Sequence, residues 1–376
     1  MKTMAYQLTD LTLNALIAPV ATATEALARL DERVRASPVR DGFVERQHFA
    51  DAAAALWLEG ELVHTEDLVL HDAHMDIRTP THELTRAHAV LRARRRIFAQ
   101  KPGWALGRDG FLALTGRGGA ILAAEGQKSR EGQGVLVPEA ETDAAMGAQV
   151  LAEEFAEIDA VLARSSKILS GAEAPARKEE TSLRDRPDLV YDFYWNEEER
   201  LAEWQAVLAE TRELPVVLRA AILLEAWTEI EVLQHAAWLG PLFCAALLRQ
   251  EGIAAHHLAC LHLGAKNIPR ERRRARSRGD RLLAFLGAIQ EAALAGLKEH
   301  DRLVLAKNQM ARRLRARRTS SKLPDLVELV LSRPLVSTGM IQEMLKVSKQ
   351  GALNLVGELN LREMTGRGRF RAWGVI

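Results

Sequence analysis

Residues 324–376 carry the pattern that most constrains how this chain can fold, because apolar residues recur there at helical spacing between clear breaks. Residues 326–331 predict a first short helix, and Pro334 blocks its continuation because proline lacks the amide hydrogen that a helix interior needs. A second helix is expected over residues 338–345, and a third over residues 349–359. Three short helices in one segment of this length predict a compact helical module.

The breaks between these helices carry residues that helix ends require. Ser337 or Thr338 can cap the second helix, and Ser348 can cap the third, because a hydroxyl accepts a hydrogen bond from a free amide of the first turn. Lys346 occupies the turn position that is usually held by glycine. The apolar residues that would pack the second and third helices against the first are Ile341, Leu345, Val347, Ala352, Val356 and Leu359.

A strand pattern follows the third helix. Residues 362–365 and 369–373 favour two strands, and the glycines at 366 and 368 favour a tight turn between them. Two strands joined by such a turn form a wing. The segment 323–376 therefore predicts a winged helix-turn-helix, a module that usually lays its recognition helix in the major groove of DNA.

The recognition helix and the wing supply the residue types that contact with DNA requires. Lys349, Gln350 and Asn354 offer donors and acceptors for base edges, since amide side chains suit adenine and lysine suits guanine. The wing offers cations for phosphates or the minor groove; these are Arg367, Arg369 and Arg371. Gly351 inside the helix departs from the commonest pattern. The alternative interpretation is a winged helix that binds another protein.

Charge is distributed unevenly along the chain, although the total is close to neutral. Residues 261–376 contain 24 basic and 10 acidic residues, a net charge of +14, and the preceding residues carry −13. This asymmetry is expected when one end of a protein binds a polyanion. The predicted partner is therefore double-stranded DNA.

Two basic runs account for much of this charge. Residues 266–278 contain seven cations and one acid, and residues 307–322 contain seven cations and no acid. The second run predicts a basic arm that contacts the phosphate backbone through Arg312, Arg313, Arg315, Arg317 and Arg318. The alternatives are a solvated helix face and, for the first run, an acidic partner in the front half of the chain.

Composition predicts a mainly α protein, with a multi-helical body and the C-terminal winged helix-turn-helix. Alanine and leucine are abundant, aromatic residues make up 5%, and 48% apolar residues suffice for a real core. The expected parts are an N-terminal helical domain at 1–110, a glycine-rich loop, helix and polar linker at 111–186, a central helical domain at 187–306, the basic arm at 307–322 and the module at 323–376.

Within the body, helices are expected near 11–35, 41–57, 81–100 and 143–169. Further helices are expected after Thr65 and from Asn196, and a loop is expected over 107–141. Cys244 and Cys260 form no metal-binding or disulfide pattern and suggest a reducing compartment. The longest apolar run is too short to span a bilayer. We expect a soluble cytoplasmic protein.

A histidine-rich segment, residues 59–88, is the one place where metal chemistry could be hidden. His71 and His74 would share a helical face at a spacing that a metal could use. No HExxH pattern accompanies them, and the alternative is that these histidines cap helices or pair with acids. We predict no metal, no cofactor and no enzyme activity.

Two resemblances add to this interpretation. Residues 46–63 and 81–88 resemble an uncharacterised alphaproteobacterial, largely rhizobial, family with a domain of unknown function and a terminal helix-turn-helix. The match covers nearly the whole chain and implies DNA binding. The front part also resembles the helices that precede the core of Fic-type adenylyltransferases. Glu59–Gly60 matches the end of their inhibitory helix, Ala55 stands in place of its hydroxyl residue, and the His-Pro-Phe motif of the Fic core is absent from the sequence.

Together these features predict a sequence-specific DNA-binding protein that regulates transcription, forms a homodimer and responds to a small-molecule or protein effector. A dimer is expected because one small module contacts few bases, and paired half-sites multiply affinity. One alternative is a plasmid-maintenance or DNA-processing accessory protein. Another is a Fic-related or metal-dependent enzyme.

Overall fold

The computed structural model describes residue 6 and residues 13–76, 79–116, 195–314, 322–364 and 371–375. The chain divides into two compact units. The first comprises Met1–Gly103 and Glu197–Ile376, and the second comprises Trp104–Asn196. The described residues are mostly helical, which confirms the predicted fold class.

The N-terminal helices of the first unit follow the predicted pattern. Thr81 begins the fourth helix, because its hydroxyl oxygen accepts a hydrogen bond from the amide of Leu84 at 3.3 Å. The second helix packs against the fourth and buries Phe43 and Phe49 completely. The four helices are α1 (Leu13–Arg35), α2 (Arg40–Leu58), α3 (Thr65–Asp72) and α4 (His82–Ala99).

A central group of helices continues the same unit after Glu197. Trp204 and Trp227 are buried, and their rings meet edge to face with centroids 5.3 Å apart, as aromatic quadrupoles prefer. Gly240 lies against the ring of Trp227, where a Cβ atom would overlap the indole. The helices are α8 (Glu197–Glu210), α9 (Val216–Ile230), α10 (Leu239–Gln250), α11 (Leu261–Lys266) and α12 (Arg270–Arg273).

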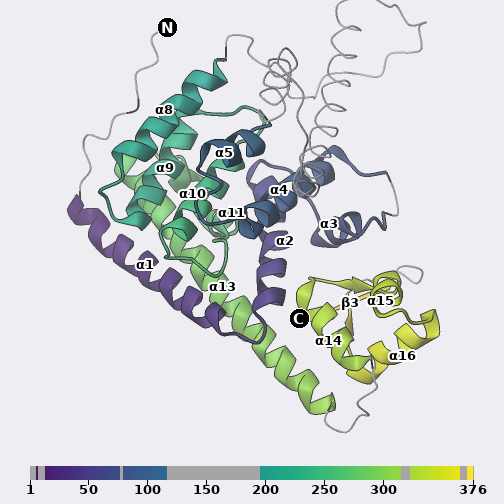
Figure 1. Ribbon diagram of the computed structural model, residues 1–376. Helices are drawn as coiled ribbons and strands as arrows, with labels where there is room; N and C mark the ends of the chain where they lie inside the picture. The colour runs from purple at the N-terminus through teal and green to yellow at the C-terminus, as the bar shows by residue number, and fades with distance from the viewer. Residues whose placement is uncertain are drawn as a thin grey trace, which may run out of the picture. The chain divides into compact units, whose positions relative to one another are not determined.

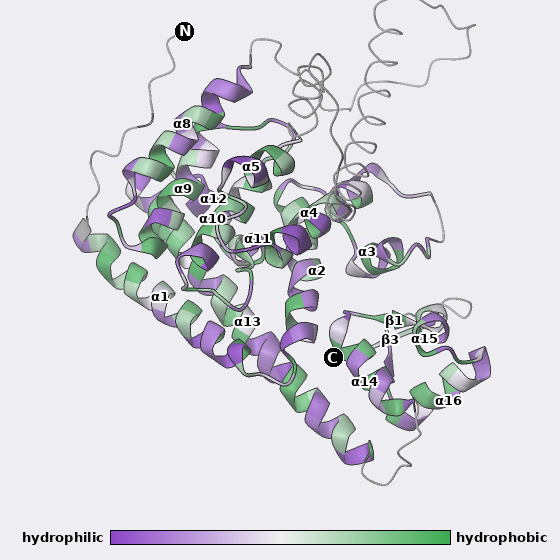
Figure 2. Cartoon of the chain, viewed as in Figure 1, coloured by the Kyte–Doolittle hydropathy of each residue, from purple (hydrophilic) through white to green (hydrophobic). Residues whose placement is uncertain are grey.

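The longest described helix, α13 (Arg278–Leu314), runs along α1, α9 and α11 and on to the C-terminal module (Figure 1). Hydrophobic and hydrophilic residues alternate along it (Figure 2). The predicted boundary at residue 307 falls inside this helix. Leu303 and Met310 are both buried, so the helical apolar spacing continues past residue 307 and the first part of the predicted arm is helix.

The C-terminal residues form three helices and a small sheet. The helices are α14 (Leu323–Ser332), α15 (Thr338–Leu345) and α16 (Lys349–Leu359), close to the predicted ranges. The strands are β1 (Val336–Ser337), β2 (Arg362–Glu363) and β3 (Ala372–Gly374), in the order β1-β3-β2 with both pairs antiparallel. β1 pairs Val336 with Trp373 and was not predicted, because two residues are too few to show a strand pattern.

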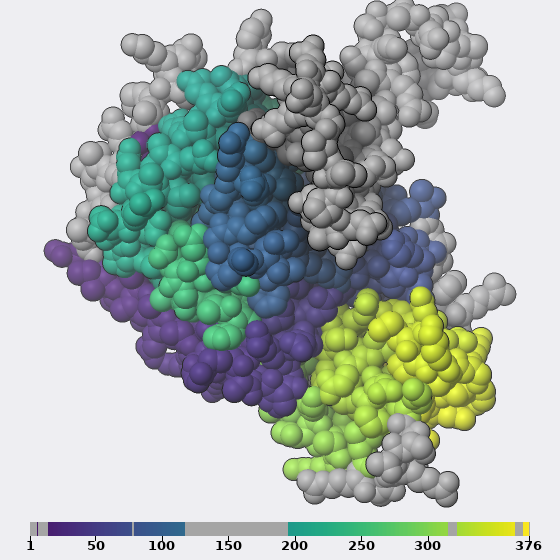
Figure 3. Space-filling view, viewed as in Figure 1, coloured from purple at the N-terminus to yellow at the C-terminus, as the bar shows by residue number. Residues whose placement is uncertain are grey.

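The C-terminal module shares its hydrophobic core with the body. One cluster of buried residues includes Phe43 and Leu56 of α2, Leu303 of α13 and Leu326 and Ile341 of the module. The C-terminal residues are in direct contact with the N-terminal helices on the face shown in Figure 3. The module is therefore packed onto the body.

In the second unit the structure describes residues 104–116 and 195–196. α5 (Arg108–Leu114) lies here, where the glycine content favoured a loop over 107–141, so that prediction is wrong for its first part. Gly110 permits the helix to pass close to the carbonyl of Trp104, which has no room for a side chain at this position. The helix expected over 143–169 lies outside the described residues.

Among the described residues, no helix has the length and apolar content that a membrane crossing requires.

Candidate nucleic-acid interface

The two helices of the helix-turn-helix are fixed at their ends by hydroxyl caps. The Ser337 hydroxyl accepts from the Met340 amide at 3.2 Å, and the Ser348 hydroxyl accepts from the Gly351 amide at 3.1 Å. Lys346 ends α15 in the left-handed region, with φ of 53°. Glycine is common at such a position because it has no Cβ, and this chain uses lysine there instead.

The outer face of α16 carries the residues predicted to contact base edges. Lys349, Gln350 and Asn354 are exposed, whereas Ala352 and Val356 face the core. The Gln350 amide Nε2 donates to Asn354 Oδ1 at 3.0 Å. The structure therefore brings Gln350 and Asn354 together on one exposed face, one helical turn apart.

The strand pair after α16 carries Arg371, the one predicted wing arginine that the structure describes. Its Nη2 lies 2.7 Å from the Glu363 carboxylate across the β2–β3 pair, and its guanidinium lies 5.4 Å from the centre of the Trp373 ring. The hydrogen bond and the charge of Glu363 raise the pKa of Arg371. Arg371 thus has an acidic partner within the module. Arg367 and Arg369 lie outside the described residues.

The predicted basic arm divides into a described and an undescribed part. Arg312 is exposed and has no hydrogen bond or ion pair within the described part of the chain. Arg313 donates from Nη1 to the carbonyl oxygen of Leu359, at the C-terminal end of α16, where a cation interacts favourably with the helix dipole. Arg313 therefore contacts α16 itself. Arg315, Arg317 and Arg318 lie outside the described residues.

A buried arginine attaches α14 to the body, and the sequence analysis did not identify it. Arg46 of α2 is 6% exposed, and its Nε donates to Glu299 at 3.0 Å. Its Nη1 donates to the carbonyl oxygens of Val330 and Arg333 at the end of α14. Those carbonyls have no partner within their own helix, so Arg46 satisfies the helix end and fixes it against α2 and α13.

An acid of α3 makes a second connection between the body and the module. The Asp72 carboxylate accepts from Arg95 at 2.9 Å and from His88 at 3.3 Å, and lies 3.5 Å from Arg333. Burial alone would raise the pKa of Asp72, but the hydrogen bonds from His88 and Arg95 lower it below its usual range. Asp72 is therefore held as a carboxylate among three basic side chains.

The histidine-rich segment does not have the arrangement that its spacing suggested. α3 ends at Asp72, so His74, with φ of 53°, lies beyond the helix and does not share a helical face with His71. His71 Nδ1 instead lies 2.9 Å from Asp76, and its ring meets that of His88 edge to face at 4.8 Å. Among the described residues, no group of three potential ligands could hold a metal ion.

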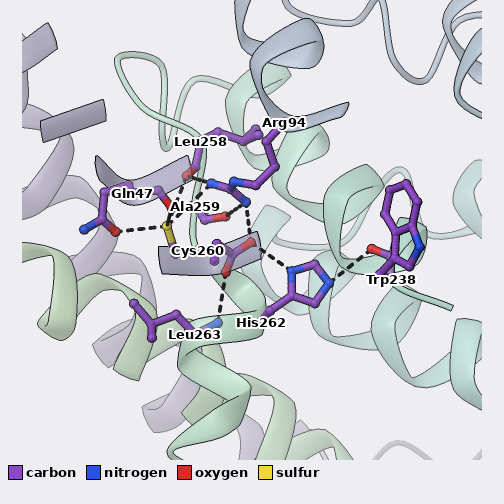
Figure 4. Close-up of polar contacts among 9 residues, drawn as sticks. Gln47, Arg94, Trp238, Leu258, Ala259, Cys260, His262 and Leu263 are labelled. Carbon is purple, nitrogen blue, oxygen red and sulfur yellow. Dashed lines mark hydrogen bonds and ion pairs between the residues drawn. The ribbon is translucent and has the colours of Figure 1, made fainter. Parts of the chain in front are cut away.

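A second polar network lies deep in the body, and the sequence analysis missed it as well (Figure 4). The buried Asp51 carboxylate accepts from Arg94, from the Leu263 amide at 2.9 Å and from His262 Nδ1 at 2.8 Å. His262 Nε2 lies 3.1 Å from the Trp238 carbonyl oxygen. The network joins α2, α4 and α11, three elements far apart in the sequence.

Cys260 borders this network as an unreactive thiol. Its Sγ lies 2.9 Å from Gln47 Oε1, and burial raises its pKa to about 12. A thiol with such a pKa is not a nucleophile at neutral pH. Cys260 and the neighbouring network are buried within the body.

Comparison with known proteins agrees with this geometry. Residues 323–376 match the family described as HTH DNA binding domain, so this segment is a helix-turn-helix DNA-binding domain. Residues 189–315 match the family described as Protein of unknown function (DUF1612).

A relative extends the match to nearly the whole chain. The protein named Uncharacterized protein y4cF of Sinorhizobium fredii (strain NBRC 101917 / NGR234) is 52% identical over 382 residues, which cover 99% of this chain and 100% of the relative. The chain therefore belongs to this rhizobial family, in which a domain of unknown function precedes a C-terminal helix-turn-helix. This confirms the resemblance to an uncharacterised, largely rhizobial family. The resemblance to Fic-type proteins stays a prediction.

Proposed function

We propose that this protein is a sequence-specific DNA-binding regulator of transcription that reads the major groove with α16. The observation that supports this proposal best is the exposed Gln350–Asn354 pair near the start of a capped helix. Amide side chains in this position can form bidentate hydrogen bonds with adenine. Lys349, in the first turn, can donate to guanine.

We propose that the remaining contacts go to the DNA backbone. The antiparallel β2–β3 pair would form the stem of the wing, and the residues between the two strands include Arg367 and Arg369. Arg312 lies at the end of α13, and its guanidinium has no hydrogen bond or ion pair within the described residues. Such cations hold a protein in register on DNA without reading its sequence.

The body has a different role in this proposal. It would form a homodimer, because two recognition helices on paired half-sites bind far more tightly than one, and it would respond to an effector. Asp51, Arg94, His262 and Cys260 are buried among their own partners. This burial supports a protein that acts by binding and not by catalysis.

The test is a titration of the full-length protein with a pool of genomic DNA fragments, followed by fluorescence anisotropy and by sequencing of the bound fraction. A steep salt dependence together with one enriched, palindromic sequence would support a dimeric regulator. Steep salt dependence without enrichment would instead favour a plasmid-maintenance or DNA-processing accessory role. Absence of binding at low salt would contradict the proposal.

A further inference from the structure

The first basic run, residues 266–278, lies far from the helix-turn-helix in the fold, at the other end of α13. It covers the end of α11, the short helix α12 and the start of α13, and α12 is labelled in Figure 2. The cations of the run are Lys266, Arg270, Arg272, Arg273, Arg274, Arg276 and Arg278.

Three of these cations contact other groups of the protein. The Lys266 ammonium lies 5.1 Å from the centre of the Trp57 ring. Arg273 Nε donates to the carbonyl oxygen of Ile268 at 3.0 Å. Arg278 bonds to the nearly inaccessible carboxylate of Glu225 at 3.3 Å. Only the contact between Arg278 and Glu225 pairs the run with an acid of its own chain, so this pairing accounts for only part of the charge.

The other four arginines are available to solvent. Arg270, Arg272, Arg274 and Arg276 are exposed, and none of them has a hydrogen bond or ion pair from its side chain within the described residues. Glu271 is the one acid in the run. Burial first, and then the charges of Arg274 and Arg270, lower the pKa of Arg273, so positive charge is crowded here. We call these four residues the α12 arginine patch.

The distance between this patch and the recognition helix follows from the length of α13. The patch adjoins Arg278 at the start of this helix, and Arg313 near its end bonds to the carbonyl of Leu359 in α16. At a rise of 1.5 Å per residue, these two arginines are separated by about 50 Å along the helix axis. That span equals about 15 base pairs of B-DNA at 3.4 Å each, so one chain can contact DNA at two separate places.

We propose that the α12 arginine patch is a second DNA-contact surface, which binds phosphates of the same duplex beyond the segment that α16 reads. Guanidinium groups bind phosphate oxygens well because their planar donors match the geometry of the anion. Four unpaired arginines in seven residues offer several such contacts without base recognition. The patch therefore lengthens the footprint and adds affinity that does not depend on sequence. This inference rests on the proposed DNA binding.

The experiment compares full-length wild type with the triple variant R270Q/R272Q/R274Q. Glutamine keeps a helix propensity near that of arginine and removes only the charge. The control variant K101Q/R212Q/K298Q removes three cations that are also exposed and unpaired among the described residues but lie outside the patch. Thermal unfolding of all three proteins checks that the fold is retained.

Binding is measured by anisotropy over a range of salt concentrations, on a duplex of about 30 base pairs and on one of about 12 base pairs. On the long duplex, the slope of log affinity against log salt should fall by about 2 to 3 in the patch variant, since each lost phosphate contact removes about 0.9. The control variant should keep the wild-type slope. On the short duplex, wild type and patch variant should agree.

A wild-type slope for the patch variant on the long duplex would overturn the second surface while leaving the proposed function intact. A wild type that binds neither duplex would overturn both. An equal loss in both triple variants would show a general effect of net charge and would also overturn the patch. A measurement on the unaltered protein gives an independent answer: the long duplex should protect Arg270, Arg272 and Arg274 from phenylglyoxal, as detected by mass spectrometry, and equal modification with and without DNA would contradict the inference.

Discussion

At the residue scale, two serines perform the same task at the start of neighbouring helices. Ser337 caps α15 and Ser348 caps α16 through hydrogen bonds of nearly equal length, 3.2 and 3.1 Å. They differ in position, because Ser348 adjoins Lys349 and Gln350 on the exposed face of α16 and Ser337 lies in β1 beside the core. Substituting each serine in turn therefore separates an effect on stability from an effect on DNA binding.

We therefore expect Ser348→Ala and Ser337→Ala each to lower the free energy of unfolding by about 1 kcal/mol, the usual cost of a lost cap. Urea unfolding measures this effect. DNA affinity, measured by anisotropy, should fall more for Ser348→Ala, since the first turn of α16 is the part proposed to meet the bases. Equal losses of affinity in the two variants would contradict the docking of α16.

The proposed division between base-reading and backbone-binding residues gives a second prediction. Asn354→Ala should cost about 1 to 3 kcal/mol on the preferred sequence and much less on unrelated DNA, because it removes a base contact. Arg312→Ala should weaken binding to all sequences alike and reduce the salt slope by about 1. Competition binding with preferred and scrambled duplexes distinguishes the two patterns. The same pattern for both variants would show that the assignment is wrong.

At the scale of elements, the contact between α2 and α14 decides how the DNA-binding module is held. A Cβ atom on Gly42 would lie 2.8 Å from the carbonyl oxygen of Leu331, so glycine is what permits the two helices to approach this closely. Arg46, one turn further along α2, bonds to the carbonyls at the end of α14. The body thus sets the position of α14, and through the shared core that of α15 and α16.

Gly42→Ala should destabilise the protein by about 1 to 3 kcal/mol, because the added methyl group meets backbone that must shift. Hydrogen exchange should increase in α14 more than in α8. Gly357→Ala is the matched control: its Cβ would meet nothing within 4 Å, and the substitution should stabilise an exposed helix by about 0.5 to 1 kcal/mol. If both substitutions stabilised the protein, the close packing of α2 on α14 would be refuted.

At the scale of the whole molecule, buried acids link distant segments and make stability depend on pH. Asp31 of α1 accepts from the His256 amide at 2.7 Å and from His257 Nδ1 at 3.1 Å. Burial alone would raise the pKa of Asp31, but the hydrogen bonds from His257 and His256 lower it to about 2. Asp51 and Asp72 also have lowered pKa values.

A carboxyl group with a lowered folded-state pKa stabilises the protein above its unfolded pKa, and this stabilisation disappears as the pH falls through the folded pKa. For Asp31 this stabilisation is lost as the pH falls from about 4 to about 2. Its contribution to the free energy of unfolding is about 1 to 2 kcal/mol after allowance for solvent screening. Urea unfolding should therefore show a wild-type advantage over Asp31→Asn at neutral pH that shrinks near about pH 3. Glu32→Gln, on an exposed neighbour paired with Arg35, should change little at either pH. If the difference in stability between wild type and Asp31→Asn did not change with pH, the proposed role of the Asp31 carboxylate would be contradicted.

The local features of this chain were determined by the sequence itself. The helices of the C-terminal module, the cap of Ser348, and the helices after Thr65 and Thr81 all follow from apolar spacing and capping residues a few positions apart. Such features depend on contacts between neighbours in the sequence, so their periodicity is visible in it. The candidate base-reading residues could be named for the same reason, because they lie on one face of a single helix.

Tertiary structure alone decided how these elements come together. Nothing local to Arg46 indicates that it binds the end of α14, 284 residues further along, and the hydrogen bonds that Asp51 accepts join α2 to α4 and α11. Likewise, the basic run at 266–278 looks uniform in sequence, but the fold pairs three of its cations with groups of the protein and leaves four arginines free among the described residues. Burial and long-range pairing depend on which surfaces meet, and residue spacing carries no record of that.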